Sequence, residues 1–131
     1  MQCETFDLDA SVLCASVNTL IDLSGNEKNI VVEDFTVEVV DGVAEFDIKW
    51  QNSLDPATHL TPPHTTSSQG STVGGKWPGD NPGGDADGGP LVCEIYYGTG
   101  SIRGVIWYYK ILIDPTTGAR TNTRHNPDDD A

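Results

Sequence analysis

The chain has 131 residues, and its 20 acidic residues against 7 basic ones give a formal net charge of −13. Domains cluster near about 100 to 150 residues, so this length suits a single domain, 1–131, and excludes a second independent core. A field of negative sign repels phosphate backbones, which disfavours direct nucleic-acid binding.

The segment 10–23, ASVLCASVNTLIDL, is compatible with a short helix or with a strand. Its apolar residues recur at helical spacing, and Asp9 and Gly25 stand where helix caps are expected. Against a helix stand its β-branched residues and the alternation of apolar and polar side chains from Phe6 to Val12. Both alternatives stay open.

Residues 35–50, FTVEVVDGVAEFDIKW, have the clearest pattern in the chain. An Asp-Gly pair at 41–42 between alternating apolar residues predicts a β-hairpin, because a type I′ turn needs positive φ at both central positions. Pairing Val40 with Val43 then places the apolar residues of both strands on one face.

The polar face of this predicted hairpin is acidic. The same register sets Glu38 directly opposite Glu45, and like charges in that relation are destabilising. One interpretation is a solvated outer face on which the repulsion is tolerable. The other is a basic partner or a cation that covers the face, which makes Glu38 and Glu45 candidate partner-binding residues.

Residues 51–90 form a long irregular segment of Gly, Pro, Ser, Thr, Asn and Asp. Segments of this length are functional or disordered, and fixing the backbone costs about 1 to 2 kcal/mol per residue. With so few apolar side chains to offset this cost, we expect neighbouring chains to order the segment. Lys76 and Trp77 interrupt it, and Trp77 either folds back onto the domain or anchors a partner.

Oxygen-rich side chains in the same segment form a weak candidate calcium site at Asp80, Asp85 and Asp87. Such residues among glycines can bind Ca²⁺, but the spacing of an EF-hand loop is absent. A solvated acidic loop is the alternative. His59 and His64 lack the further ligands that zinc requires.

Residues 91–114, LVCEIYYGTGSIRGVIWYYKILID, predict a second hairpin around a turn at 98–101. Its second strand carries consecutive apolar residues at 105–109, so that strand needs cover on both faces. The aromatic residues of this block are either core or candidate partner contacts: Tyr96, Tyr97, Trp107, Tyr108 and Tyr109. The tail 119–131 is polar and is not expected to fold alone.

Together these patterns predict a mainly antiparallel all-β fold, a sandwich or small barrel of about six to eight strands. Cys3, Cys14 and Cys93 lack metal-site spacing and are expected to be buried free thiols. No catalytic motif is present, and no cofactor other than Ca²⁺ is indicated.

The predicted function is a non-enzymatic structural protein, with no chemistry of its own, that belongs to a larger repeating assembly. A viral capsid decoration protein or a head/tail joining protein would suit these features, located in a virion or a cytoplasmic assembly. The predicted partners are other protein subunits, as a homo-oligomer or on a protein lattice. The alternative is an acidic binding module, either for carbohydrate with a calcium-supported loop or as a DNA mimic that inhibits a basic protein.

Overall fold

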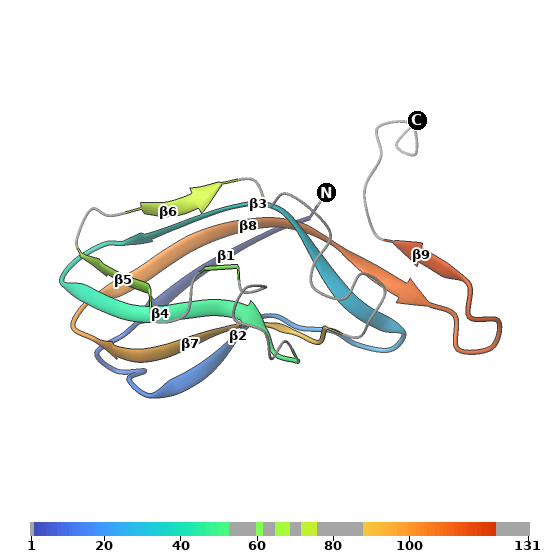
Figure 1. Cartoon of the computed structure of the whole chain (residues 1–131), viewed down its shortest axis with the longest axis horizontal. Coiled ribbons are helices and arrows are strands. Elements are labelled where there is room, and N and C mark those ends of the chain that lie inside the picture. The colour runs from blue at the N-terminus through green and yellow to red at the C-terminus, as the bar shows by residue number, and fades with distance from the viewer. Residues whose placement is uncertain (1, 53–59, 62–64, 69–71, 76–87, 123–131) are drawn as a thin grey trace.

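The computed structural model describes residues 2–52, 60–61, 65–68, 72–75 and 88–122. In these residues the chain forms nine β-strands and no helix, arranged in two antiparallel sheets that pack face to face (Figure 1). The predicted all-β sandwich is confirmed. Of the two alternatives for segment 10–23, the helix is wrong: residues 10–15 form a turn and a strand follows.

The first sheet, sheet A, has the order β1-β8-β3-β6, with β9 pairing to the far end of β8. Two of its strands, β3 and β8, are unusually long, and β8 continues beyond β1 to reach β9. The bounds are Gln2–Asp9 for β1, Ser101–Ile113 for β8, Glu27–Val39 for β3, Thr72–Gly75 for β6 and Arg120–Asn122 for β9.

The second sheet, sheet B, has the order β2-β7-β4-β5. Its strands run from Ser16–Ile21 in β2, Leu91–Gly98 in β7, Val43–Trp50 in β4 and Thr65–Ser68 in β5. The edges of the two sheets coincide: β1 and β2 contact each other on one side of the sandwich. The central segment of the chain supplies the opposite edges, β6 and β5.

The predicted hairpin over 35–50 is wrong, because β3 and β4 lie in different sheets. β3 pairs with β8 and β6, whereas β4 pairs with β7 and β5. The chain between Val39 and Val43 crosses the sandwich, and of the Asp-Gly pair only Gly42 has positive φ, at 67°. An alternating pattern shows which face is buried, and this face is the same for a hairpin and for a crossover between sheets.

The predicted hairpin over 91–114 is wrong for the same reason: β7 belongs to sheet B and β8 to sheet A. The two connections, residues 40–42 and 99–100, pack against each other and are called here the crossover pair. Val40 N donates to Ser101 O at 2.8 Å, and Thr99 N donates to Val43 O at 2.9 Å. Each chain crossing therefore supports the other.

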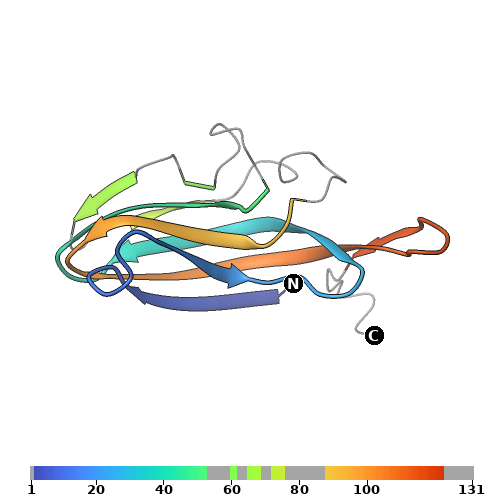
Figure 2. The ribbon, with the colours of Figure 1, turned by 90° about the horizontal axis from the view of Figure 1, so that it is seen from below.

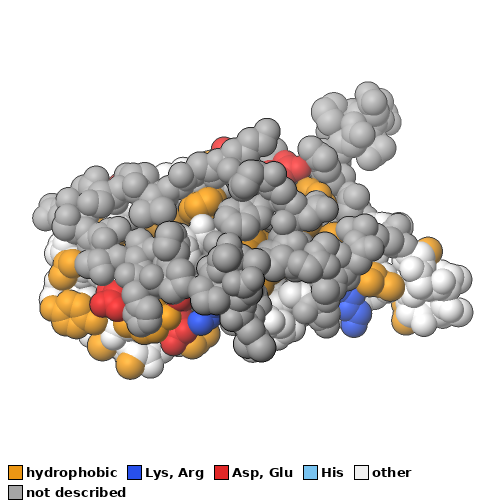
Figure 3. Space-filling model, in the orientation of Figure 1, with side chains coloured by type: hydrophobic (Ala, Val, Ile, Leu, Met, Phe, Trp, Pro, Cys, Tyr) orange, Lys and Arg blue, Asp and Glu red, His pale blue; other side chains and the backbone are white. Residues whose placement is uncertain are grey.

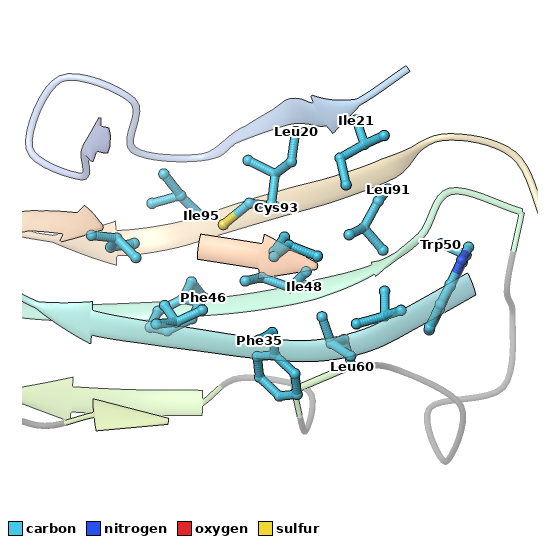
Figure 4. Close-up of a cluster of buried hydrophobic side chains, with 14 of the residues drawn as sticks. Leu20, Ile21, Phe35, Phe46, Ile48, Trp50, Leu60, Leu91, Cys93 and Ile95 are labelled. Carbon is cyan, nitrogen blue, oxygen red and sulfur yellow. The ribbon is translucent and has the colours of Figure 1, made fainter. Parts of the chain in front are cut away.

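The core lies between the sheets and is built from the alternating apolar residues of the long strands (Figure 4). The residues of β3 and β4 predicted to share one hairpin face instead face each other across the sandwich, Phe35 and Val37 against Phe46 and Ile48. Burying each such side chain contributes about 1.5 to 3 kcal/mol. The buried Trp50 Nε1 donates to Ile30 O at 2.8 Å and so links the two sheets.

Part of the central segment folds against its own domain. Leu60 and Thr61 are buried, Leu60 N donates to Ile48 O at 2.8 Å, and Ile48 N donates to Thr61 Oγ1 at 2.8 Å. Two strands of this segment, β5 and β6, extend the sheets. The expectation that neighbouring chains order the segment is therefore wrong for these residues. The polar tail differs too, since its residues 120–122 form β9.

Candidate functional site

A groove of about 420 Å³ opens where the edge strands of the two sheets meet. Its walls are Glu4 of β1, Tyr108 and Lys110 of β8, and residues 19–24 at the end of β2. We call it the β1–β2 groove. The strands that frame it, β1 in dark blue and β2 in blue, lie side by side along the lower side of Figure 2. The groove thus lies between the edge strand β1 of sheet A and the edge strand β2 of sheet B.

The edge strand β2 carries no charge on its six residues, SVNTLI, and the edge strands β5 and β6 are uncharged as well. Among the described strands it pairs with β7 alone. Exposed edges commonly carry charges or proline, which discourage pairing with another chain. The neighbouring edge strand β1 follows this rule with Glu4, Asp7 and Asp9, whereas β2 exposes Val17 to 59%. The edge of β2 is therefore open to strand addition.

The basic side chain of the groove is already paired. Lys110 Nζ donates to Glu27 Oε1 at 3.2 Å, and Glu27 also accepts from Ser24 N at 2.8 Å. Burial favours the neutral acid of Glu27, but the hydrogen bonds from Ser24 and Lys110 and the Lys110 charge outweigh it and lower the Glu27 pKa. The carboxylates of Glu4 and Asp22 then leave the groove with an excess of negative charge.

Tyr108 keeps its proton within this groove. Burial raises the pKa of its hydroxyl above the usual value of 10.0, and the nearby charges of Glu4 and Glu27 raise it further. At neutral pH the groove thus presents a neutral phenol, carboxylates and a strand edge. These groups suit hydrogen bonding to an extended, positively charged chain.

A second polar cluster lies on the outer face of sheet B. The Tyr96 hydroxyl donates to Asp47 Oδ2 at 2.8 Å, and Lys49 Nζ donates to Glu94 Oε1 at 2.5 Å. The Asp47 side chain is only 1% exposed, and Lys49 Nζ lies 3.9 Å from its Oδ1. Burial, followed by the hydrogen bond and charge of Asp47, raises the pKa of Tyr96 far above its usual range. We call these four residues the outer cluster.

Acidic, basic and apolar side chains gather at one end of this face (Figure 3). Tyr97 stands beside the outer cluster and is 54% exposed. Lys49 lies close to both carboxylates of the outer cluster and offsets one of their two negative charges. These contacts connect side chains of β4 and β7.

The predicted aromatic group is divided among three surfaces. Tyr96 belongs to the outer cluster of sheet B, and Tyr108 lines the β1–β2 groove with most of its ring buried. Trp107 and Tyr109 alternate with Tyr108 along β8 and so lie on the outer face of sheet A. The separation follows from the crossover after β7, which sends the two halves of the predicted hairpin to opposite layers.

The predicted contact between Glu38 and Glu45 does not exist. Glu38 lies in sheet A in register with Arg103, whose Nε donates to Asp7 Oδ2 at 3.0 Å. Glu45 lies in sheet B in register with Tyr97. The destabilising pair of like charges is thus replaced by an alternation of acid and base in sheet A and by an aromatic neighbour in sheet B.

Five predicted site residues lie outside the described residues: Lys76, Trp77, Asp80, Asp85 and Asp87. The partner-anchoring role of Lys76 and Trp77 and the calcium site stay predictions. In the ranges that the structure describes, no group of three or more His, Cys, Asp and Glu residues could hold a metal ion.

The cysteines differ from the expected buried thiols at two of three positions. Cys3 and Cys14 are exposed, and Cys14 Sγ donates to Tyr96 O at 3.4 Å. Cys93 is buried in the core, and burial, together with the charges of Asp47 and Glu94, raises its pKa to about 12. The Cys93 thiol therefore stays protonated at neutral pH.

Sequence reasoning missed the β1–β2 groove and the edge of β2. The available signal was the uncharged stretch at 16–21 in a chain of net charge −13. Comparison with protein-family models, with curated proteins and with solved structures finds no match. Within the described part of the chain, no helix is long and apolar enough to cross a membrane.

Proposed function

We propose that this chain is a non-enzymatic assembly module that docks onto other protein subunits through the edge of β2. A component of a repeating assembly, such as a capsid decoration or joining protein, has this role. The observation that carries the proposal is the uncharged edge strand β2, which exposes Val17 to 59% in a chain of net charge −13. A strand of a partner can add to such an edge by main-chain hydrogen bonds.

Exposed apolar side chains support docking at the same place. The large hydrophobic residues that are exposed in the described part of the chain are Val12 at 75%, Val17 at 59% and Tyr97 at 54%. Val17 belongs to β2, Val12 to the turn before it and Tyr97 to the adjacent strand β7. A partner strand on β2 would cover apolar surface there as well as pair with the backbone.

Site-directed cross-linking in the native source tests this proposal. A photoreactive side chain is introduced at the exposed Thr19 of β2, and in a control chain at the exposed Thr121 of β9. We expect one adduct of defined mass from position 19 and none from position 121. Adding Val17→Lys should suppress that adduct, because a charge on the edge opposes strand pairing.

The mass of the adduct identifies the kind of assembly. An adduct of twice the chain mass of 14.1 kDa indicates self-association, and any other mass indicates a different subunit. Equal cross-linking from both positions, or an adduct that persists with Val17→Lys, would refute docking at β2.

A further inference from the structure

We propose that the partner segment is basic: it adds to β2 as an extended strand and places a lysine or arginine side chain in the β1–β2 groove. This inference rests on the proposed docking at β2 and adds the chemistry of the partner. It follows from the charges that line the groove.

The groove has room and negative charge for one cationic side chain. Its volume is about 420 Å³ and it is open to solvent, and Glu4 and Asp22 contribute carboxylates from its two sides. The cation already present, Lys110, is held by Glu27 at 3.2 Å, so its charge is offset. A cation that enters would gain attraction from both remaining carboxylates and could donate to the Tyr108 hydroxyl.

The geometry of the edges favours a strand over a free cation. Side chains of an added strand would alternate between the inner side, where the groove opens between the sheets, and the outer side, where Val17 is exposed. The matching partner therefore alternates basic with apolar residues. A small amine would use the groove but leave the backbone edge and Val17 without contact.

A second copy of this chain fits the same place less well. Beside β2, the edge strand β1 presents Glu4, Asp7 and Asp9. Hydrogen bonds from the Ser11 side chain and backbone lower the Asp9 pKa, so this carboxylate stays ionised well into acid. Two copies, each of net charge −13, would bring these acidic edges together. A basic strand would neutralise them.

Peptide binding to the purified chain tests the inference. The probes are fluorescent peptides in which valine alternates with lysine, glutamate or serine, and fluorescence anisotropy is measured at about 0.05 M salt, where screening is weak. We expect the lysine peptide to bind most tightly. Its affinity should fall as the salt concentration rises.

Two matched double variants locate the charge effect. Glu4→Gln with Asp22→Asn removes two charges from the groove, and we expect about fivefold weaker binding of the lysine peptide, from ion pairs worth about 0.2 to 1 kcal/mol each. Glu38→Gln with Glu45→Gln removes the same charge from the outer faces, far from the groove. This control should change affinity by less than about twofold, because Coulomb attraction falls with the distance between the charges.

A second matched pair locates the strand. Val17→Lys adds a positive charge to the edge of β2, and Thr121→Lys adds the same charge to β9. The first should abolish binding of the lysine peptide, and the second should leave it nearly unchanged. Circular dichroism of each variant checks that the fold is retained.

The outcomes separate the two proposals. If the serine peptide binds as tightly as the lysine peptide and Val17→Lys still blocks both, docking at β2 stands and the basic partner is wrong. If only the outer-face variant weakens binding, the groove is not the cation site. If no peptide binds, or Val17→Lys has no effect, docking of a strand at β2 fails as well.

Discussion

Replacing Gly100 with alanine tests the crossover pair directly. A Cβ atom at this position would lie 1.4 Å from Asp41 O and 2.4 Å from Asp41 C. Both are backbone atoms of the other connection, so no side-chain rotation relieves the clash. The two crossovers must move apart for the alanine to be accommodated.

The cost of this movement can be estimated from the contacts it breaks. Separation of the crossovers weakens three hydrogen bonds, Val40 N to Ser101 O at 2.8 Å, Thr99 N to Val43 O at 2.9 Å and Ser101 N to Asp41 Oδ1 at 2.9 Å. Each contributes about 1 kcal/mol net, and overpacking itself costs about 1 to 3 kcal/mol. We expect Gly100→Ala to lower the free energy of unfolding by about 4 to 6 kcal/mol.

Urea denaturation monitored by tryptophan fluorescence measures this loss, with an unchanged slope as the check that unfolding stays two-state. Gly118→Ala is the control, because Gly118 has φ of 73° but nothing lies within 4 Å of its Cβ position. That variant should lose only the backbone strain of about 1 to 2 kcal/mol. If Gly100→Ala lowers the free energy of unfolding by no more than Gly118→Ala does, the two connections do not pack together. The crossover between the sheets would then be refuted in favour of the predicted hairpins.

Three further predictions concern other contacts of the fold. Tyr96→Phe removes the hydroxyl that donates to the buried Asp47 at 2.8 Å and should cost about 1 to 3 kcal/mol, whereas Tyr97→Phe at an exposed ring should be neutral; thermal unfolding of both compares them. The Glu27 pKa lies below its ordinary value of 4.5 in the folded chain, so its stabilisation is complete above that pH and is lost as the pH falls through the folded pKa. Wild type and Glu27→Gln should therefore differ in stability at pH 7 and converge in acid, and a constant difference across this range would contradict the ion pair. With the native cysteines replaced, Glu38→Cys with Arg103→Cys, which are in register, should form a disulfide on mild oxidation, whereas Glu38→Cys with Glu45→Cys should not; free-thiol titration distinguishes the two.

The all-β class was predictable because local patterns report burial. Alternation along residues 35–50 identifies Phe35, Val37, Phe46 and Ile48 as inward-facing, and all four are buried. The same alternation does not show which strand is the hydrogen-bonded neighbour in the sheet, since a hairpin and a crossover between sheets bury the same residues. Pairing is decided by long-range contacts such as β3 with β8, which a single sequence does not display.

The candidate site was less predictable, because it is defined by elements that are distant in sequence. Glu4, Asp22 and Lys110 meet only after β1 and β2 have taken edge positions in different sheets. Charge made Glu38 and Glu45 conspicuous, whereas the relevant feature of β2 is a local absence of charge. The aromatic residues were conspicuous because they cluster within one predicted hairpin, yet only Tyr108 of that group lines the groove.

The strand order itself bears on the proposed assembly role. The connections β3–β4 and β7–β8 both cross between the sheets, so these four strands occupy the middle of the two sheets. The edge strands come from two separate parts of the chain. The N-terminal strands β1 and β2 form one side of the sandwich, and β5 and β6 of the central segment form the other. A subunit that joins two neighbours requires more than one contact surface, and this topology places edge strands on two opposite sides of the sandwich. A subunit that uses β2 alone would decorate a lattice, whereas one that also uses the β5–β6 side would join two neighbours. Ser67→Lys in β5 separates these cases when the yield of assembled particles is measured. A decorating subunit would keep its full yield, and a joining subunit would lose it.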